Sequence, residues 1–182
     1  LQAATPTNDA DVATKSYVID LVNGLSYKDP ARVGTQNAPA ATYANGAGTL
    51  TANANGAIQI DSISLIANDR VLVKSFAGAA RVGNGIYKVT TVGDAENPYV
   101  LTRTADFNDN DEIPSSAVFV KEGSDADALF VCQNDSVTLG TTEITFAQAS
   151  GAGSISAGSG LSKSGNTISF DKGDGLVFDG NE

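Results

Sequence analysis

The sequence predicts a mainly β protein with a short N-terminal α-helix, an antiparallel β-sandwich or barrel, and a glycine-rich C-terminal shaft of β repeats. Three observations predict this fold class. Apolar residues recur with a helical period only within residues 1–25. Residues 26–150 contain short runs of alternating apolar and polar side chains, separated by Gly, Asn and Asp. In residues 151–182, a glycine-punctuated unit occurs twice.

Residues 1–25 are predicted to form one helix that needs a packing partner. Pro6 precedes the helical pattern, Asp9 or Asp11 provides an N-cap, and Gly24 provides a left-handed stop. The apolar stripe of this helix consists of Val18, Leu21, Val22 and Leu25. An isolated helix of about 14 residues is only marginally stable in water. Its partner is therefore either the protein's own globular domain or the same helix of other subunits in a parallel bundle.

Residues 26–150 are predicted to form one antiparallel β domain. Strand-like runs occur at 57–66, 69–76, 85–93, 99–107, 117–123, 128–135 and 143–149. Turn residues separate these runs at intervals of about ten residues, a spacing typical of a sandwich or barrel. Residues 34–57 contain few large apolar side chains, so we expect a long surface loop or weak edge strands there.

Residues 151–182 are predicted to form a linker and then the start of a β shaft. Gly158 and Leu161 recur at Gly173 and Leu176, a step of 15 residues. One hairpin of this size is unstable in water, and such repeats bury apolar side chains by stacking or by winding around identical chains. The side chains expected to face other chains are Leu161, Ile168, Phe170, Leu176 and Phe178. A flexible Gly/Ser tail is the alternative.

Composition excludes several classes of function. The chain has no histidine, which removes Ser-His-Asp and Cys-His catalysis and histidine-ligated zinc. Its net charge of −10 and its scattered basic residues disfavour nucleic acid and anionic membranes as partners. No apolar run reaches the roughly 18 residues needed to cross a bilayer. Because the chain starts at Leu1 and lacks Met, we expect a processed protein or part of a longer one.

Two acidic loops are candidate ligand sites. The first is a candidate calcium loop, because oxygen-rich loops attract calcium; it contains Asp106, Asn108, Asp109, Asn110, Asp111 and Glu112. This loop lacks the Gly and Glu positions of an EF-hand, and a solvated loop between strands is the alternative. The second loop contains Glu122, Asp125 and Asp127 and is expected to be a solvated hairpin tip. No other metal or cofactor is expected.

Carboxylate pairs hydrolyse glycosides when they are held about 5 to 10 Å apart. Asp109 or Glu112 opposite Asp125 would therefore make a capsule-degrading enzyme, an alternative that spacing along the chain does not settle. An exposed aromatic ring offers a flat apolar face to a sugar. The aromatic residues that could make such a contact if exposed are Tyr27, Tyr43, Tyr87, Tyr99 and Phe107. Tyr43 is the better candidate for a glycan contact, since it lies in the loose Ala-, Asn- and Gly-rich stretch. Tyr87 and Cys132 lie in strand patterns and are expected in the core.

The N-terminal stretch ATPTNDADVATKSYVIDLVNGL resembles a segment of tail fibres and related virion proteins of tailed bacteriophages. In that family a Pro-Thr-x-x-x-Asp-Ala-x-x-Lys-x-Tyr-Val pattern opens a helix. The matching positions here are Pro6, Thr7, Asp11, Lys15, Tyr17 and Val18, and Ala13 and Thr14 lie between Asp11 and Lys15. The similarity extends over roughly residues 4–151, through DRVLVKSF, YVLTRTADFND and AVFVKEGSDADALFVCQND.

This resemblance implies a non-enzymatic structural protein of the virion tail, assembled in the host cytoplasm. It implies a homotrimer that links the tail to distal receptor-binding parts and contributes to host attachment. The implied partners are other tail or baseplate proteins and a host surface glycan or protein. The residues leave another class open, a carbohydrate-binding β-sandwich module of a bacterial surface protein or secreted enzyme. Such a module would be monomeric and would fold without residues 1–25.

Overall fold

The computed structural model describes residues 26–149, 157–158, 161–164 and 167–170. Within them the protein is mainly β, with several sheets and only short 3₁₀ helices, which confirms the mainly β prediction. The 3₁₀ helices are η1 (Asn45–Ala47), η2 (Gly78–Gly83), η3 (Ala105–Phe107) and η4 (Gly123–Asp125). No helix in this described part is long and apolar enough to span a bilayer. The predicted N-terminal helix over residues 1–25 lies outside the described residues.

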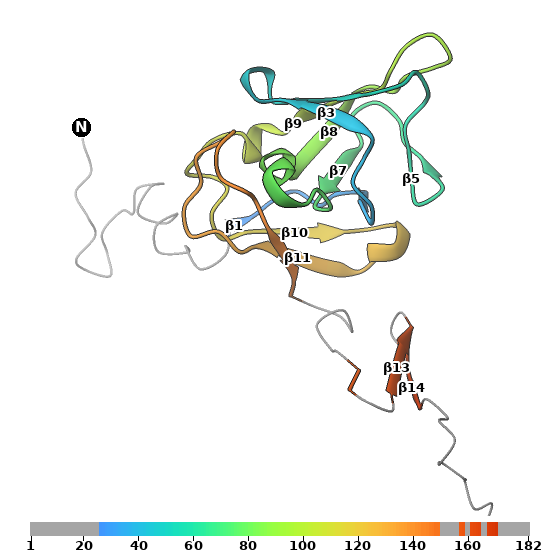
Figure 1. The fold of residues 1–182 in the computed structure, drawn as a ribbon, viewed down its shortest axis with the longest axis vertical. Coiled ribbons are helices and arrows are strands. Elements are labelled where there is room, and N and C mark those ends of the chain that lie inside the picture. Colours follow the sequence, from blue (N-terminus) through green and yellow to red (C-terminus); the bar gives the residue numbers. More distant parts are fainter. Residues whose placement is uncertain (1–25, 150–156, 159–160, 165–166, 171–182) are drawn as a thin grey trace, which may run out of the picture.

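The first large sheet has four strands in the order β1-β10-β11-β12. These strands are Ser26–Tyr27, Ser116–Val120, Ala128–Cys132 and Phe146–Gln148. β10, β11 and β12 pair antiparallel, and β1 runs parallel to β10. β1 and β12 are the two edges of the sheet and also the first and last strands of the domain (Figure 1). The segments before and after the domain are therefore joined to opposite edges of one sheet.

The second large sheet has six strands in the order β2-β7-β8-β9-β4-β3. These strands are Val33–Gly34, Arg70–Val73, Gly85–Thr91, Val100–Arg103, Thr49–Ala52 and Ala41–Ala44. β2 runs parallel to β7, and the other neighbours pair antiparallel. The barrel alternative is wrong for the described residues, because this sheet stays open with β2 and β3 as its edges.

The prediction of purely antiparallel pairing is wrong for two pairs of strands, β1 with β10 and β2 with β7, for one physical reason. Residues 26–34 run as a single segment along the edges of both large sheets. Ala31 bridges Val120 of the first sheet in parallel, and the next residue, Arg32, donates its backbone N–H to Arg70 O of the second sheet at 2.8 Å. The same segment therefore supplies the parallel edge strands β1 and β2.

Two stretches differ from their predicted structure. The run 57–66, predicted as one strand, is a small hairpin of β5 (Gln59–Ile60) and β6 (Ile63–Ser64). Its turn residues Asp61 and Ser62 have φ of 51° and 63°, values typical of a two-residue hairpin turn. In the stretch 34–57, β3 is an edge strand of the second sheet, which confirms the alternative of weak edge strands in part. β4 lies between β9 and β3 and buries Leu50 completely, so the alternative of a surface loop is wrong there.

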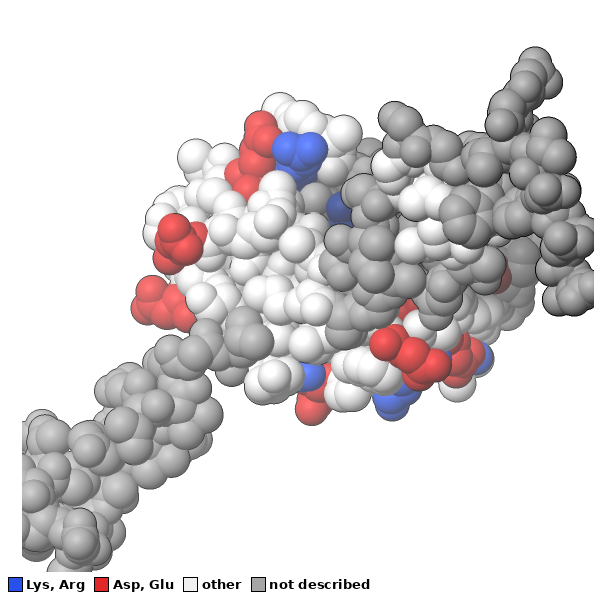
Figure 2. All heavy atoms as spheres, turned by 90° about the horizontal axis from the view of Figure 1, so that it is seen from below, with Lys and Arg blue, Asp and Glu red and all other residues white. Residues whose placement is uncertain are grey.

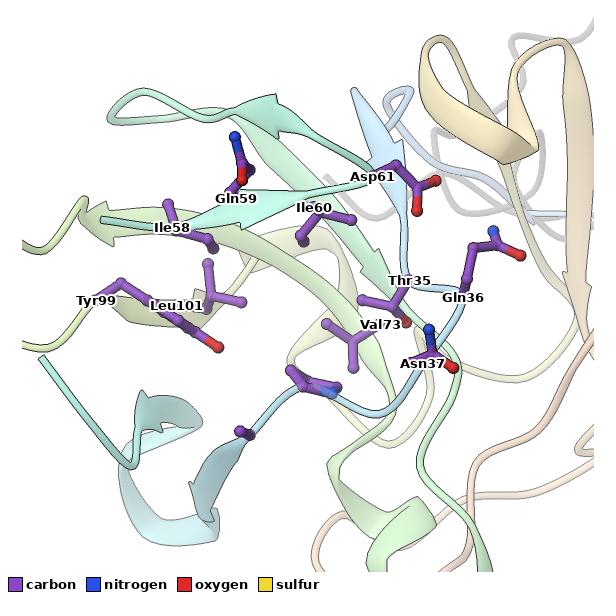
Figure 3. Close-up of a pocket in the computed structure, with 12 residues that line it drawn as sticks. Thr35, Gln36, Asn37, Ile58, Gln59, Ile60, Asp61, Val73, Tyr99 and Leu101 are labelled. Carbon is purple, nitrogen blue, oxygen red and sulfur yellow. The ribbon is translucent and has the colours of Figure 1, made fainter. Parts of the chain in front are cut away.

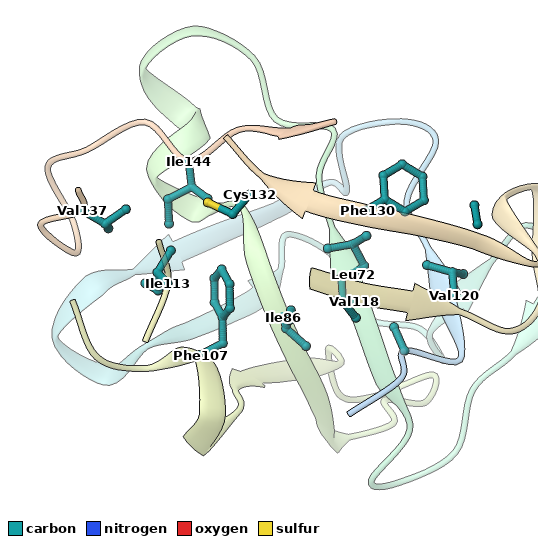
Figure 4. Packing of buried hydrophobic residues seen from close by; sticks show 12 residues of the cluster. Leu72, Ile86, Phe107, Ile113, Val118, Val120, Phe130, Cys132, Val137 and Ile144 are labelled. Carbon is teal, nitrogen blue, oxygen red and sulfur yellow. The ribbon is translucent and has the colours of Figure 1, made fainter. Parts of the chain in front are cut away.

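The second sheet is buried on both faces, which explains its runs of consecutive apolar residues. Leu72 and Ile86 point into a first core cluster, against side chains of the four-stranded sheet such as Val118 and Phe130 (Figure 4). Val71, Val73, Tyr87, Val89 and Leu101 point into a second cluster on the opposite face. The predicted core position of Tyr87 is confirmed, since its side chain is fully buried.

The C-terminal part contributes one described hairpin. β13 (Leu161–Ser164) pairs antiparallel with β14 (Thr167–Phe170), so that Leu161 lies opposite Phe170 and Lys163 opposite Ile168. This hairpin falls on the first copy of the 15-residue unit. The second copy, with Leu176 and Phe178, lies outside the described residues.

Candidate functional site

The four-stranded sheet has an apolar outer face. Side chains alternate along a strand, and Val118, Val120, Phe130 and Cys132 point into the core. The alternate residues therefore form the outer sheet face, which consists of Tyr27, Ala117, Phe119, Leu129, Val131 and Ala147. Strand register places Tyr27, Ala117, Val131 and Ala147 in one row and Phe119 beside Leu129 in the next.

Two aromatic side chains of this outer sheet face are exposed. Tyr27 is 71% and Phe119 38% exposed. From below, on the side where this sheet lies in Figure 1, the described surface is largely neutral at its centre, and charged side chains gather toward its margins (Figure 2). Tyr27 and Phe119 are therefore exposed apolar side chains on a largely uncharged surface, a combination that suits an interaction site.

A pocket of about 250 Å³ opens over the second core cluster. It lies between the segment after β2, the β5–β6 hairpin and the start of β9. The described residues that line this polar-rimmed pocket are Thr35, Gln36, Asn37, Pro39, Ala40, Ile58, Gln59, Ile60, Asp61, Val73, Tyr99 and Leu101. Tyr99 stands on one side and Gln36 and Asn37 on the other (Figure 3). Ile58, Val73 and Leu101 are buried and make its base apolar.

Three anchors hold the walls of the pocket. Thr35 N donates to Leu72 O at 2.9 Å, and Thr35 Oγ1 accepts from Lys74 N at 3.1 Å. At the tip of the β5–β6 hairpin, Asp61 Oδ2 accepts from Ser124 N at 2.9 Å, which ties the hairpin to η4. Asp94 Oδ1 accepts from the backbone N–H groups of the turn before Tyr99, at 2.9 and 2.8 Å. These hydrogen bonds hold the pKa of Asp94 below its usual value.

The rim of the pocket carries uncommitted polar groups. Within the described part of the chain, the side chains of Gln36, Asn37 and Tyr99 make no hydrogen bond to protein, whereas the Thr35 hydroxyl is engaged. Tyr99 is half-buried, and this burial raises the pKa of its phenol, so it carries a neutral hydroxyl at physiological pH. Amide and hydroxyl groups both donate and accept hydrogen bonds.

The structure does not gather the predicted calcium ligands into one site. Asp106 accepts both terminal nitrogens of Arg70, at 3.2 and 2.8 Å. Asp109 Oδ1 caps the backbone N–H of Asp111 at 3.1 Å, and Asn110 Oδ1 accepts from Leu139 N at 2.9 Å. The remaining members, Asn108 and Glu112, complete no cluster, and the described residues contain no group of three or more carboxylates or thiols able to hold a metal.

The prediction that the second acidic loop is a solvated tip is wrong for Asp125 but holds for Glu122, whose side chain is 47% exposed. Glu122 pairs with Arg32, with Oε1 and Nε 3.1 Å apart. Asp125 Oδ2 lies 3.0 Å from Lys74 Nζ, and the two side chains are only 10% and 15% exposed. Lys74 Nζ also lies 4.9 Å from the centre of the Phe130 ring. The proposed pairing of Asp125 with Asp109 or Glu112 for glycoside hydrolysis therefore loses one carboxylate to a structural ion pair.

Tyr43 is a packing residue rather than a free aromatic surface. Its hydroxyl accepts from Arg103 Nε at 3.1 Å, and its ring centre lies 5.1 Å from Arg103 Cζ. Arg103 is buried, and its Nη2 also donates to Val82 O and Asn84 O, each at 2.9 Å. Tyr43 thus covers a buried guanidinium and is itself half-buried, and its contact with a glycan stays a prediction.

Only some of the residues predicted to form trimer contacts lie among the residues that the structure describes. Leu161 is half-buried and Ile168 is 43% exposed. Phe170 lies on β14, and nothing is described of its side chain. The helix residues Val18, Leu21, Val22 and Leu25 lie outside the described residues. Cys132 is buried and its pKa is raised by that burial, which confirms the expected inert position.

Sequence reasoning named Tyr27 and Tyr99 only as aromatic residues that could contact a sugar if exposed, and it missed Phe119, Gln36 and Asn37. Phe119 stands between the core residues Val118 and Val120, so strand alternation alone could have indicated that it points outward. Gln36 and Asn37 carried no comparable signal, because their proximity to Tyr99 depends on how distant loops pack.

Comparisons of the chain with protein-family models, with curated proteins and with solved structures found no match.

Proposed function

We propose that the chain is a structural segment of a phage tail fibre or tail tip. In this proposal it forms a homotrimer in the virion tail, links the tail to distal receptor-binding parts, contributes to host attachment and has no enzymatic activity. Its partners are other tail or baseplate proteins and a host surface glycan or protein. The observation that carries the proposal is the outer sheet face, whose exposed members Tyr27 and Phe119 lie on the sheet that is joined to both flanking segments.

The placement of the flanking segments supports this proposal. The N-terminal segment with the stripe Val18, Leu21, Val22 and Leu25 leads directly into β1, one edge of the sheet. The repeat units follow β12, the other edge. Both segments have sequences suited to self-association, and both are attached to a sheet that exposes Tyr27 and Phe119. Copies packed around a common axis would cover these side chains together.

Charge and the C-terminal hairpin give further support. A chain with a net charge of −10 repels its own copies, so self-association needs neutral apolar surface of the kind that the outer sheet face provides. Ile168 on β14 is 43% exposed within a hairpin that is too small to be stable alone. Other chains wound around this hairpin would supply the missing contacts.

Light scattering on the purified full chain tests the proposal. We expect three times the chain mass of 18.5 kDa. Phe119→Asp should lower the mass because it places a charge in the proposed interface. The matched control is Ile66→Asp, because Ile66 is a 65% exposed aliphatic residue outside the outer sheet face, and this variant should keep the parent mass. A parent chain that is monomeric although its circular dichroism spectrum shows folded β structure would contradict the proposal.

The polar-rimmed pocket favours a second candidate, a carbohydrate-binding module of a bacterial surface protein or secreted enzyme. Pockets with an apolar base and a few polar rim groups are the usual form of a small-ligand site. The two candidates differ in their assembly. A module would be monomeric and would retain its fold when residues 1–25 are removed, whereas the fibre segment would lose its oligomeric mass.

A further inference from the structure

We infer that the polar-rimmed pocket binds one neutral sugar residue, held between Tyr99 and the amides of Gln36 and Asn37. This inference goes beyond the proposed function, since it assigns a ligand class to a specific site and requires no trimer. The pocket volume of about 250 Å³ lies just below the 300 to 1,000 Å³ typical of ligand pockets. It therefore suits a single sugar ring rather than an extended oligosaccharide.

The charges around the pocket favour a neutral ligand. None of the described residues that line it is Lys or Arg, and Asp61 is the one carboxylate among them. One oxygen of Asp61 is engaged by Ser124 N. A phosphate, a sulfate or an acidic sugar would find no cation to pair with, and the net charge of −10 would repel it further.

The rim chemistry matches a polyhydroxylated ligand. A sugar hydroxyl both donates and accepts hydrogen bonds, as do the amides of Gln36 and Asn37 and the phenol of Tyr99. These groups have no protein partner among the described residues, so a ligand would not have to break existing hydrogen bonds. A purely apolar ligand would leave the same groups buried and unsatisfied, which is unfavourable.

The base of the pocket matches the other side of a sugar ring. Pro39 and Ile60 line the pocket and are half-buried, so they can present apolar surface to the ring's C–H groups. Ile58, Val73 and Leu101, which are exposed by no more than 2%, lie beneath this surface and keep the base free of polar atoms. Tyr99 adds an aromatic wall to this surface (Figure 3). The combination of apolar base and amide rim distinguishes this pocket from the outer sheet face, which has no amide side chain among its members.

The walls are positioned before any ligand arrives. The turn at Asp61 and Ser62 is tied to η4, and the turn before Tyr99 is held by Asp94. Gly93, with φ of 81°, lies so close to the backbone of Gly56 that a Cβ there would collide with it. Pre-organised walls reduce the ordering cost of binding, which matters for a small ligand with few contacts.

Saturation-transfer NMR on the full chain tests this inference, with glucose, galactose, mannose and N-acetylglucosamine as separate probes and N-acetylneuraminic acid as the anionic probe. We expect at least one neutral sugar to bind with millimolar affinity and the anionic probe to bind more weakly. Gln36→Ala and Asn37→Ala should each weaken binding about three- to tenfold, as expected for one lost hydrogen bond. Tyr99→Phe, which keeps the ring, tests the hydroxyl alone.

Gln133→Ala is the matched control, because Gln133 is another exposed glutamine and does not line the pocket. This variant should leave sugar binding unchanged. The inference is overturned if no neutral sugar binds, if binding is insensitive to Gln36→Ala and Asn37→Ala, or if the anionic probe binds equally well. None of these results alters the mass measured by light scattering, so failure here is distinguishable from failure of the proposed trimer.

Discussion

Replacing Lys74 with Met tests whether the ion pair with Asp125 supports the packing of the two large sheets. Lys74 follows β7 of the six-stranded sheet, and Asp125 ends η4, between β10 and β11 of the four-stranded sheet. Their side chains are 15% and 10% exposed, so water screens the pair only weakly. Lys74→Met keeps the length of the side chain and removes its charge.

We expect the substitution to lower the free energy of unfolding by about 3 kcal/mol. Removing one partner of a buried ion pair costs about 3 to 5 kcal/mol, because the other charge stays buried without compensation. The lower end applies here, since Asp125 Oδ2 receives no aligned hydrogen bond although Lys74 Nζ lies 3.0 Å away. Loss of the ammonium beside the Phe130 ring adds to the effect.

Urea unfolding measures this effect. With a denaturant dependence of about 2 kcal/mol/M, a loss of about 3 kcal/mol lowers the midpoint by about 1.5 M. The chain has no Trp, so circular dichroism or tyrosine fluorescence provides the signal. A loss below about 1 kcal/mol, as is usual for exposed pairs, would refute the buried-pair reasoning. The double variant with Asp125→Asn should be less destabilised than the sum of the single variants.

A pair of glycine variants provides an independent control on the same contact. A Cβ at Gly34 would collide with the carboxylate of Asp125, whereas a Cβ at Gly46 would meet no atom of the described residues within 4 Å. Gly34→Ala should therefore be destabilising by about 1 to 3 kcal/mol, as is usual for overpacking. Gly46→Ala should leave the midpoint nearly unchanged, and equal effects of the two variants would contradict the packing described around Asp125.

Two further predictions concern acid stability and thiol reactivity. Burial alone would raise the pKa of Asp106, but hydrogen bonds from Arg70 and Thr104 outweigh it and hold the pKa below its ordinary 3.8. At acidic pH the unfolded chain therefore binds more protons than the folded chain, so this stabilisation is present above about pH 4 and is lost as the pH falls through the folded-state pKa. When urea midpoints are measured down to about pH 3, the midpoint of Asp106→Asn should fall less steeply with pH than that of the parent chain. Cys132 is buried with a raised pKa, so a chromogenic thiol reagent should react with it only after denaturant is added, and rapid native labelling would contradict that burial.

The strands could be predicted from local pattern, but their neighbours could not. Short apolar or alternating runs between turn residues marked β7 to β12, because each of these strands buries at least one of its two faces. The same rule failed at residues 57–66, where the turn at Asp61 and Ser62 divides the run into a hairpin. It also failed at β4, whose position between β3 and β9 is set by pairing with residues about 50 positions away, such as Leu50 with Leu101.

The sequence by itself determined the mainly β architecture and the buried positions of Tyr87 and Cys132. It also excluded Ser-His-Asp catalysis, Cys-His catalysis and histidine-ligated zinc within this chain, because the chain has no histidine. Only the tertiary structure decided that Tyr43 covers Arg103, that Asp125 is paired inside the molecule, and which side chains surround the pocket. The physical reason is the range of the interactions. Strand periodicity is a property of neighbouring residues, whereas an ion pair, a cation–π contact and a pocket arise between segments brought together by folding, which no local pattern records.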